Sequence, residues 1–301
     1  MAEIVLLDGG MGQELVARND ADPTPMWSAR VLADRPDLVE AVHRDFFEAG
    51  ATVATLNTYS VTPERLHRHA PDEDTDALFE RLQAAAIRVA SAARGDRDVA
   101  LAGCLPPLAW SYRPDAAPPQ GLMQQTYARL VAAQGDHCDL MLAETMSGVR
   151  EAGAATRAIV AAGHLAWIAL SVDDRDGTRL RSGEPLEDGI SAVAEAGADA
   201  ILLNCSRPEA IAQGLPILAT VHVPFGAYAN GFEFAGDLEF GGTVKGLTKR
   251  LELTPEAYAD HAMTWIAAGA TIVGGCCEVG PAHIAHLAQR IRAAGHRVVR
   301  P

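Results

Sequence analysis

Short runs of apolar residues recur along the chain, eight in all, and most continue without a polar interruption. Continuous runs of this length are typical of strands that are buried on both faces of a parallel sheet. The predicted strands are 4–8, 52–58, 99–105, 140–145, 166–172, 200–206, 224–230 and 271–277.

Between these runs, apolar residues fall three and four positions apart, which predicts amphipathic helices. The predicted helices are 36–48, 76–93, 122–136, 147–162, 186–196, 255–268 and 281–294, with a shorter one over 208–215. Ser147 is the expected N-cap of its helix. Strand and helix alternating eight times predict a (β/α)8 TIM barrel, a single domain over residues 1–301. A doubly wound open sheet is the alternative.

Composition narrows the possible partners. The 301 residues are 49% hydrophobic and 21% charged, with a net charge of −14. That sign repels nucleic acid and anionic membrane surfaces, so we expect neither as a partner. The five cysteines show no disulfide framework, and we find no signal peptide or membrane-spanning run. These features lead us to expect a cytoplasmic protein.

Polar and sulfur-bearing residues occupy the carboxyl ends of the predicted strands. In a barrel enzyme these ends surround the active site. In chain order they are Asp8, Asn57, Cys104, Glu144, Ser171, Cys205, Asn230 and the pair Cys276–Cys277. The fold therefore predicts that four cysteines and two carboxylates converge on one mouth.

Three of these cysteines form a candidate metal site. Cys205 ends strand six, and Cys276 and Cys277 follow two glycines at the end of strand eight. Adjacent strand residues point to opposite faces, so both can reach one ion only where the chain leaves the strand. Thiolates suit Zn²⁺, and three protein ligands are typical of a catalytic zinc with an open position.

Simpler roles compete with these. Cys104 and Cys138 are best interpreted as small buried residues, and Cys138 lies at the opposite end of the barrel. The 276–277 pair could instead form a redox-active vicinal disulfide. Asp8 and Glu144 could bind an ammonium group or a metal, act as a base, or cap the following turn and helix.

Other chemistry-bearing residues lie in predicted loops. Trp27, Trp110 and Tyr112 could hold a cationic group through their rings, or pack beneath a loop. His67 and His69 have the spacing of some metal sites but do not end a strand, so we expect them to be solvated.

The sequence resembles the homocysteine S-methyltransferase family over nearly its whole length. The matching elements are LLDGGMGQEL near the start, TLNTY at strand two, LAET at strand four, LLNCS at strand six and IVGGCC at strand eight. The combination of the LLNCS and GGCC elements is the most specific part.

This resemblance implies a TIM barrel that moves a methyl group to homocysteine to make methionine. It implies Zn²⁺ held by Cys205, Cys276 and Cys277. It also implies that the homocysteine ammonium is held by Asp8 and Glu144. Residues 1–301 would then be one homocysteine-binding domain. We expect Asn57, in the TLNTY element, to bind substrate as well.

The methyl donor is not fixed by these motifs. The loops 105–121 and 231–251 depart from the patterns of known subgroups and are expected to face the donor, and the loop 19–29 is expected to form part of the wall or lid of the site. An onium compound such as S-methylmethionine or a betaine fits the chemistry. The alternative functions are a zinc-thiolate storage protein, which needs a fourth protein ligand, and a dithiol redox protein. Neither an oligomeric state nor the true acceptor, homocysteine or an analogue, follows from the motifs.

Overall fold

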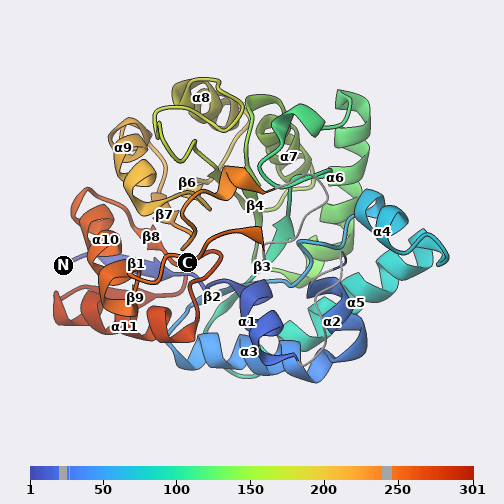
Figure 1. The fold of residues 1–301 in the computed structure, drawn as a ribbon, viewed down its shortest axis with the longest axis horizontal. Helices are drawn as coiled ribbons and strands as arrows, with labels where there is room; N and C mark the ends of the chain where they lie inside the picture. Colours follow the sequence, from blue (N-terminus) through green and yellow to red (C-terminus); the bar gives the residue numbers. More distant parts are fainter. Residues whose placement is uncertain (20–25, 27, 239–245) are drawn as a thin grey trace.

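The computed structural model describes residues 1–19, 26, 28–238 and 246–301. A ring of helices surrounds a cylinder of parallel strands (Figure 1). The strands are β1 (Glu3–Leu6), β2 (Val53–Thr55), β3 (Ala100–Leu105), β4 (Leu140–Met146), β5 (Ala166–Leu170), β6 (Ala200–Asn204), β7 (Phe225–Tyr228), β8 (Ile272–Val273) and β9 (Arg297–Val299).

The predicted TIM barrel is confirmed. Strands β2 to β8 follow one another in the sheet, and β8 pairs with β1. A parallel bridge between Leu7 and Val53 joins β1 to β2, and the Asp8 backbone N–H donates to the Val53 carbonyl at 3.0 Å. The cylinder is therefore closed, which rules out the open doubly wound sheet.

All eight predicted strands are present, and a ninth was not predicted. Strand β9 pairs in parallel with the first residues of β1, with Glu3 opposite Arg297. Because Leu7 pairs with Val53 further along, β9 occupies the place beside β1 at the amino end of the barrel.

Eight helices of the described chain match predicted ones, whereas those over 11–18, 28–34 and 63–69 were not predicted. The helices are α1 (Met11–Arg18), α2 (Ser28–Asp34), α3 (Pro36–Glu48), α4 (Pro63–His69), α5 (Thr75–Arg94), α6 (Gln120–Gln134), α7 (Val149–Ala161), α8 (Leu186–Glu195), α9 (Pro208–Leu218), α10 (Pro255–Ala267) and α11 (Pro281–Ala293). Three 3₁₀ turns lie at Pro114–Ala116, Gly135–His137 and Ala235–Asp237.

One helix start was predicted wrongly. The N-cap of α7 is Gly148, and the Ser147 hydroxyl donates to the Thr145 carbonyl instead. The first backbone N–H of α7, on Val149, donates to the Glu184 carboxylate at 3.0 Å. A side chain from the loop after β5 thus replaces the local cap.

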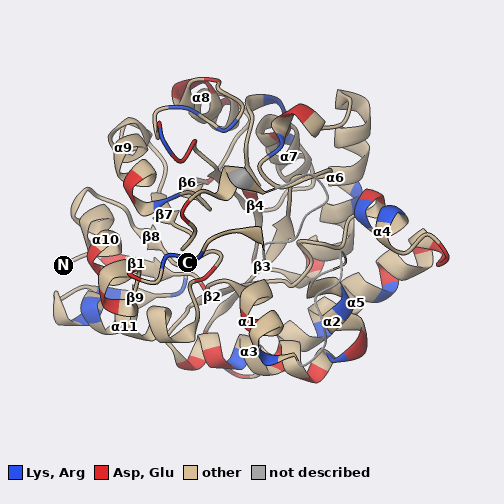
Figure 2. Cartoon of the chain, viewed as in Figure 1, with Lys and Arg blue, Asp and Glu red and all other residues tan. Residues whose placement is uncertain are grey.

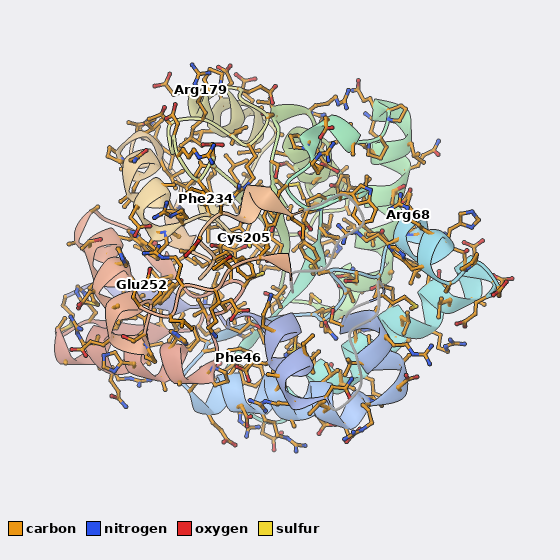
Figure 3. The ribbon with its side chains drawn as sticks, viewed as in Figure 1. Phe46, Arg68, Arg179, Cys205, Phe234 and Glu252 are labelled. Carbon is orange, nitrogen blue, oxygen red and sulfur yellow. The ribbon has the colours of Figure 1, made fainter. Side chains whose placement is uncertain are left out.

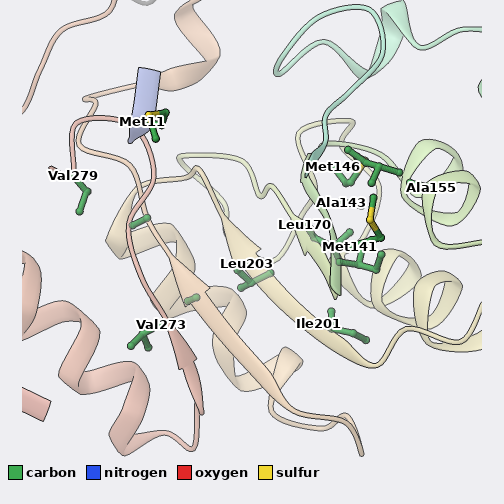
Figure 4. Close-up of a cluster of buried hydrophobic side chains, with 14 of the residues drawn as sticks. Met11, Met141, Ala143, Met146, Ala155, Leu170, Ile201, Leu203, Val273 and Val279 are labelled. Carbon is green, nitrogen blue, oxygen red and sulfur yellow. The ribbon is translucent and has the colours of Figure 1, made fainter. Parts of the chain in front are cut away.

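Alternate residues along each strand divide the core into two layers. Side chains such as Leu142, Ala169 and Leu202 fill the barrel interior. Their neighbours face outward onto the helices. Figure 4 shows part of this outer layer, with Met141, Leu170 and Ile201 of three adjacent strands. Two-sided burial explains why the strands read as continuous apolar runs.

Charged side chains lie mainly on the outer helices (Figure 2). No helix in the described ranges is both long enough and apolar enough to cross a membrane.

Candidate active site

Cys205, Cys276 and Cys277 come together at the carboxyl end of the barrel. Their Sγ atoms all lie within 4.8 Å of one another, and those of Cys205 and Cys277 are 3.9 Å apart. Cys205 is buried and lies near the centre of the ring of helices (Figure 3). All five cysteines of the chain are free thiols.

Cys205 adopts a left-handed backbone conformation directly after β6, with φ of 46°. A residue with a side chain is rarely found there, and the strain costs about 1–3 kcal/mol. Neighbours on both sides hold the conformation: the Cys205 N–H donates to the Tyr228 carbonyl, and Arg181 Nη2 donates to the Cys205 carbonyl at 3.0 Å.

The two glycines before Cys276 allow close packing. Neither has a positive φ. A Cβ at Gly274 would lie 2.5 Å from the Leu7 Cβ, and one at Gly275 would lie 2.2 Å from Val279 Cγ1. Strand β8 ends at Val273, before the two glycines. Cys276 and Cys277 therefore lie outside the regular strand, which is necessary if both are to reach one site. The two glycines thus let the β8 loop approach the β1 loop closely.

A buried wall supports Cys205 from behind. Tyr112 Oη lies 3.0 Å from Cys205 Sγ, and the Arg181 guanidinium lies 4.7 Å from the Tyr112 ring centroid. Arg181 forms a two-pronged ion pair with Asp174, at 2.9 and 3.0 Å. Asp174 also accepts from the Arg207 and Ala235 backbone N–H groups, which ties together the loops after β5, β6 and β7.

The three thiols are not equivalent. Burial raises the pKa of Cys205, but hydrogen bonds from Cys276, Cys277 and Tyr112 and the charge of Arg181 outweigh it and set that pKa well below the ordinary value. Hydrogen bonding to Cys205 raises the pKa of Cys276 and of Cys277. Negative charge therefore gathers first on Cys205.

Asp8 lies in the loop after β1 and is almost fully buried. Its carboxylate accepts from the Thr55 N–H at 2.9 Å. Burial raises the pKa of Asp8 to about 8, and the charge of Glu144 adds to that rise, although the Thr55 hydrogen bond opposes it.

Glu144 reaches the same region from β4. It accepts from Cys104 Sγ at 3.2 Å and from Tyr228 Oη at 3.3 Å. Burial raises the pKa of Glu144 to about 7, against the lowering effect of these two donors. A buried and a partly buried carboxylate, with no cationic side chain of the described chain paired to either, form a site suited to an ammonium group.

One cavity joins the thiols and the carboxylates. Its lining includes all six predicted site residues, namely Asp8, Asn57, Glu144, Cys205, Cys276 and Cys277. Asn57 is buried, and its Nδ2 donates to the Ser28 carbonyl at 3.3 Å. The barrel thus brings residues that are up to 269 positions apart in the chain into a single cavity.

Three other predicted strand ends do not line this cavity. Cys104 lies behind Glu144 and orients it, so it is more than a small buried residue. The Ser171 hydroxyl donates to the Asn204 carbonyl, and Asn230 Oδ1 accepts from the Phe232 N–H. Ser171 and Asn230 thus bind backbone groups of the loops, which need hydrogen-bond partners where they are buried away from water.

Part of the cavity lining is aromatic. Tyr59, Trp110 and Tyr112 line it, together with Arg65 and His69. The expectation that His69 is solvated was wrong, since it is half-buried and packs edge-on against Trp110 at 6.0 Å between ring centroids. Trp27, and the loop segments 20–25 and 239–245, lie outside the described residues.

Sequence reasoning missed several supporting residues. Tyr112 was noted only as an aromatic, while Arg181, Asp174 and Tyr228 carried no signal. Tyr228 closes β7 and could have been found by counting every strand end. Arg181 sits in a loop, where periodicity gives no direction to a side chain.

The chain is similar to known proteins along most of its length. The model of the family described as homocysteine S-methyltransferase matches residues 5–291. The chain belongs to this family.

Relatives support the assignment along the whole length. The homocysteine S-methyltransferase of Escherichia coli is 29% identical, with 96% of this chain and 95% of that protein covered. A selenocysteine methyltransferase of Astragalus bisulcatus is 26% identical, with 92% and 89% covered. The metallated form of the E. coli homocysteine methyltransferase MmuM superposes with a TM-score of 0.78, at 30% identity and 96% coverage of both chains. This homocysteine S-methyltransferase family member is therefore a methyltransferase that transfers a methyl group to homocysteine.

Proposed function

We propose that the enzyme transfers a methyl group from an onium donor to the thiol of homocysteine with the help of Zn²⁺, and so makes methionine. The observation that carries the proposal is one cavity that holds three clustered thiols at one side and two carboxylates at another. A molecule with a thiol and an ammonium matches both.

The cysteine cluster fits zinc. A tetrahedral site with Zn–S bonds of about 2.3 Å has sulfur atoms about 3.8 Å apart. Cys205 and Cys277 have their sulfurs 3.9 Å apart, and Cys276 lies within the same group. Three soft sulfur donors favour Zn²⁺ over harder cations. The relative solved in a metallated form is consistent with this choice.

Zinc bound there would lower the pKa of the homocysteine thiol and supply a nucleophilic thiolate at neutral pH. Cys205, Cys276 and Cys277 would hold it. Cys205 is held in place by Arg181, which donates to its carbonyl, and by the Tyr112 hydroxyl beside its sulfur.

Asp8 and Glu144 bind the homocysteine ammonium in this proposal. Each carboxylate already has a fixed direction, given to Asp8 by Thr55 and to Glu144 by Cys104 and Tyr228. Charge-assisted hydrogen bonds from the ammonium favour the ionised carboxylates. Asn57 contacts the same substrate from the loop after β2. Fixing both ends of homocysteine orients its sulfur toward the donor methyl group.

We also propose that residues 1–301 act as one homocysteine-binding domain in the cytoplasm. The net charge of −14 supports small-molecule substrates rather than nucleic acid or a membrane surface. S-methylmethionine, S-adenosylmethionine, betaine and dimethylsulfoniopropionate are the donors to test.

The decisive experiment is metal analysis and methionine formation in Cys277→Ala. We expect bound zinc to fall below 0.1 per chain, on the order of a tenfold loss for one lost thiolate, and methionine formation to fall below detection. Cys138→Ala is the matched control, because Cys138 is a free thiol outside the cavity. Full zinc occupancy in Cys277→Ala would show that the ligand set is wrong.

A further inference from the structure

Arg65 brings a positive charge to the lining of the cavity. It lies in α4, whose N-cap Thr62 accepts from the Arg65 N–H at 3.4 Å. Its guanidinium is held on one side by the Pro107 carbonyl, at 3.0 Å from Nη2, and lies 5.2 Å from the Tyr59 ring centroid. Among the described residues that line the cavity, Arg65 is the one arginine or lysine.

This charge has no anionic partner in the described chain. No carboxylate forms an ion pair with Arg65, and its Nε is buried without an acceptor. Glu151, whose charge acts on Arg65, is occupied by the Leu108 N–H and the Tyr127 hydroxyl. A buried guanidinium stays charged and is unfavourable without a paired anion.

The position of Arg65 separates it from the carboxylates. Asp8 and Glu144 contact residues of β2, β3 and β7. Arg65 instead contacts the loops that follow β2 and β3, through Tyr59 and Pro107. A homocysteine bound by its ammonium between Asp8 and Glu144 would keep its own carboxylate beside that pair, whereas Arg65 lines another part of the same cavity.

The charge also restricts what enters that space. A donor that carried only an onium charge would be repelled by Arg65 across a low-dielectric cavity. A donor that carries a carboxylate as well would pair with it, and the guanidinium fork matches a carboxylate in two-pronged geometry.

We propose that Arg65 binds a carboxylate of the methyl donor and selects zwitterionic onium carboxylates over simple onium cations. This rests on the proposed function, since it assumes an onium donor. Arg65 is then a specificity-determining residue that takes no part in holding homocysteine.

The test compares donors with and without a carboxylate. One pair is S-methylmethionine and its decarboxylated analogue, (3-aminopropyl)dimethylsulfonium. A second pair is dimethylsulfoniopropionate and ethyldimethylsulfonium. Methionine formation is measured with zinc-loaded protein at saturating homocysteine, for wild type, Arg65→Gln and Arg65→Lys. Arg68→Gln is the control, because Arg68 lies on the same helix but outside the cavity lining.

For whichever donor pair the wild-type enzyme uses, we expect kcat/KM to be at least tenfold higher for the member that carries a carboxylate. Arg65→Gln should bring this ratio close to one, Arg65→Lys should leave it in between, and Arg68→Gln should not change it. The homocysteine KM should stay unchanged in all three variants. Unaltered melting temperature and zinc content check that each variant is folded.

Two results would overturn the proposal while the proposed function stands. One is the same donor ratio in wild type and Arg65→Gln. The other is a raised homocysteine KM in Arg65→Gln with an unchanged donor ratio, which would assign Arg65 to the acceptor. Absence of methionine in wild type with these four donors, and also with S-adenosylmethionine and betaine, would instead overturn the onium-donor function itself, and this inference with it.

Discussion

The wall behind the cysteines and the lining of the cavity treat buried charge in opposite ways. In the wall, Arg181 and Asp174 are each 4% exposed at the side chain and are paired to each other with further hydrogen bonds. In the lining, Arg65 has no carboxylate partner among the described residues, and the charge of Glu144 raises the pKa of Asp8. The paired charges stabilise the loops of the wall, whereas the unpaired charges line the cavity in which we expect ligands to bind.

The largest test of this comparison is the stability of two matched substitutions. Arg181→Met leaves Asp174 buried without its cation, so we expect the free energy of unfolding to fall by about 3–5 kcal/mol. Arg65→Met removes a charge that has no partner and should change the free energy of unfolding by less than about 1 kcal/mol. Urea denaturation of the metal-free proteins measures both. Equal losses would erase the distinction between wall and lining.

The second test removes one carboxylate from the lining. Glu144→Gln keeps the shape but loses the charge that we assign to the homocysteine ammonium. We expect the homocysteine KM to rise roughly 10- to 100-fold, as for the loss of one charge-assisted hydrogen bond. Zinc content should not change. A wild-type KM would remove Glu144 from the substrate site.

The third and smallest effect is a pH dependence. Burial raises the pKa of Asp8 to about 8 and that of Glu144 to about 7, so the folded protein holds these protons where the unfolded chain does not. Stability from this source is complete below the ordinary carboxyl pKa and is lost as the pH rises through about 7 to 8. Homocysteine binding should show the opposite trend and tighten over that range, because the ammonium pairs with the ionised carboxylates.

Asp8→Asn is the variant that separates the two trends. It keeps an acceptor for the Thr55 N–H but cannot ionise. Its melting temperature should fall less than that of wild type between pH 6 and pH 9. An identical fall in both proteins would mean that Asp8 titrates in its ordinary range.

The sequence was sufficient for the barrel because burial on both strand faces leaves an unbroken apolar run, as in 200–206, whatever the loops do. It also predicted that the six candidate site residues would meet, because strand ends of a closed barrel lie together, and all six line one cavity. It could not show the partners of those residues. Cys104 looked like a small core residue, and only the register between β3 and β4, with Cys104 opposite Leu142, brings its thiol beside Glu144.

Strand β9 and the inward position of Arg65 were not predicted, for related reasons. Strand β9 is a short, partly exposed segment, so its burial pattern is weak, and its pairing with β1 joins residues 294 positions apart. Arg65 lies on a seven-residue helix in a charged stretch that reads as surface. Nothing local to the sequence shows that its guanidinium turns inward and lacks an anion.

The contact between the β1 loop and the glycines of the β8 loop also determines when the cysteine site can form. A chain emerging from the ribosome carries the first strand long before residues 271–277, so the cylinder stays open and Cys205 has no companions until translation is nearly finished. Contacts of such long sequence separation form late and slowly. In the proposed function, zinc would therefore bind after translation, once the last quarter of the chain has closed the barrel.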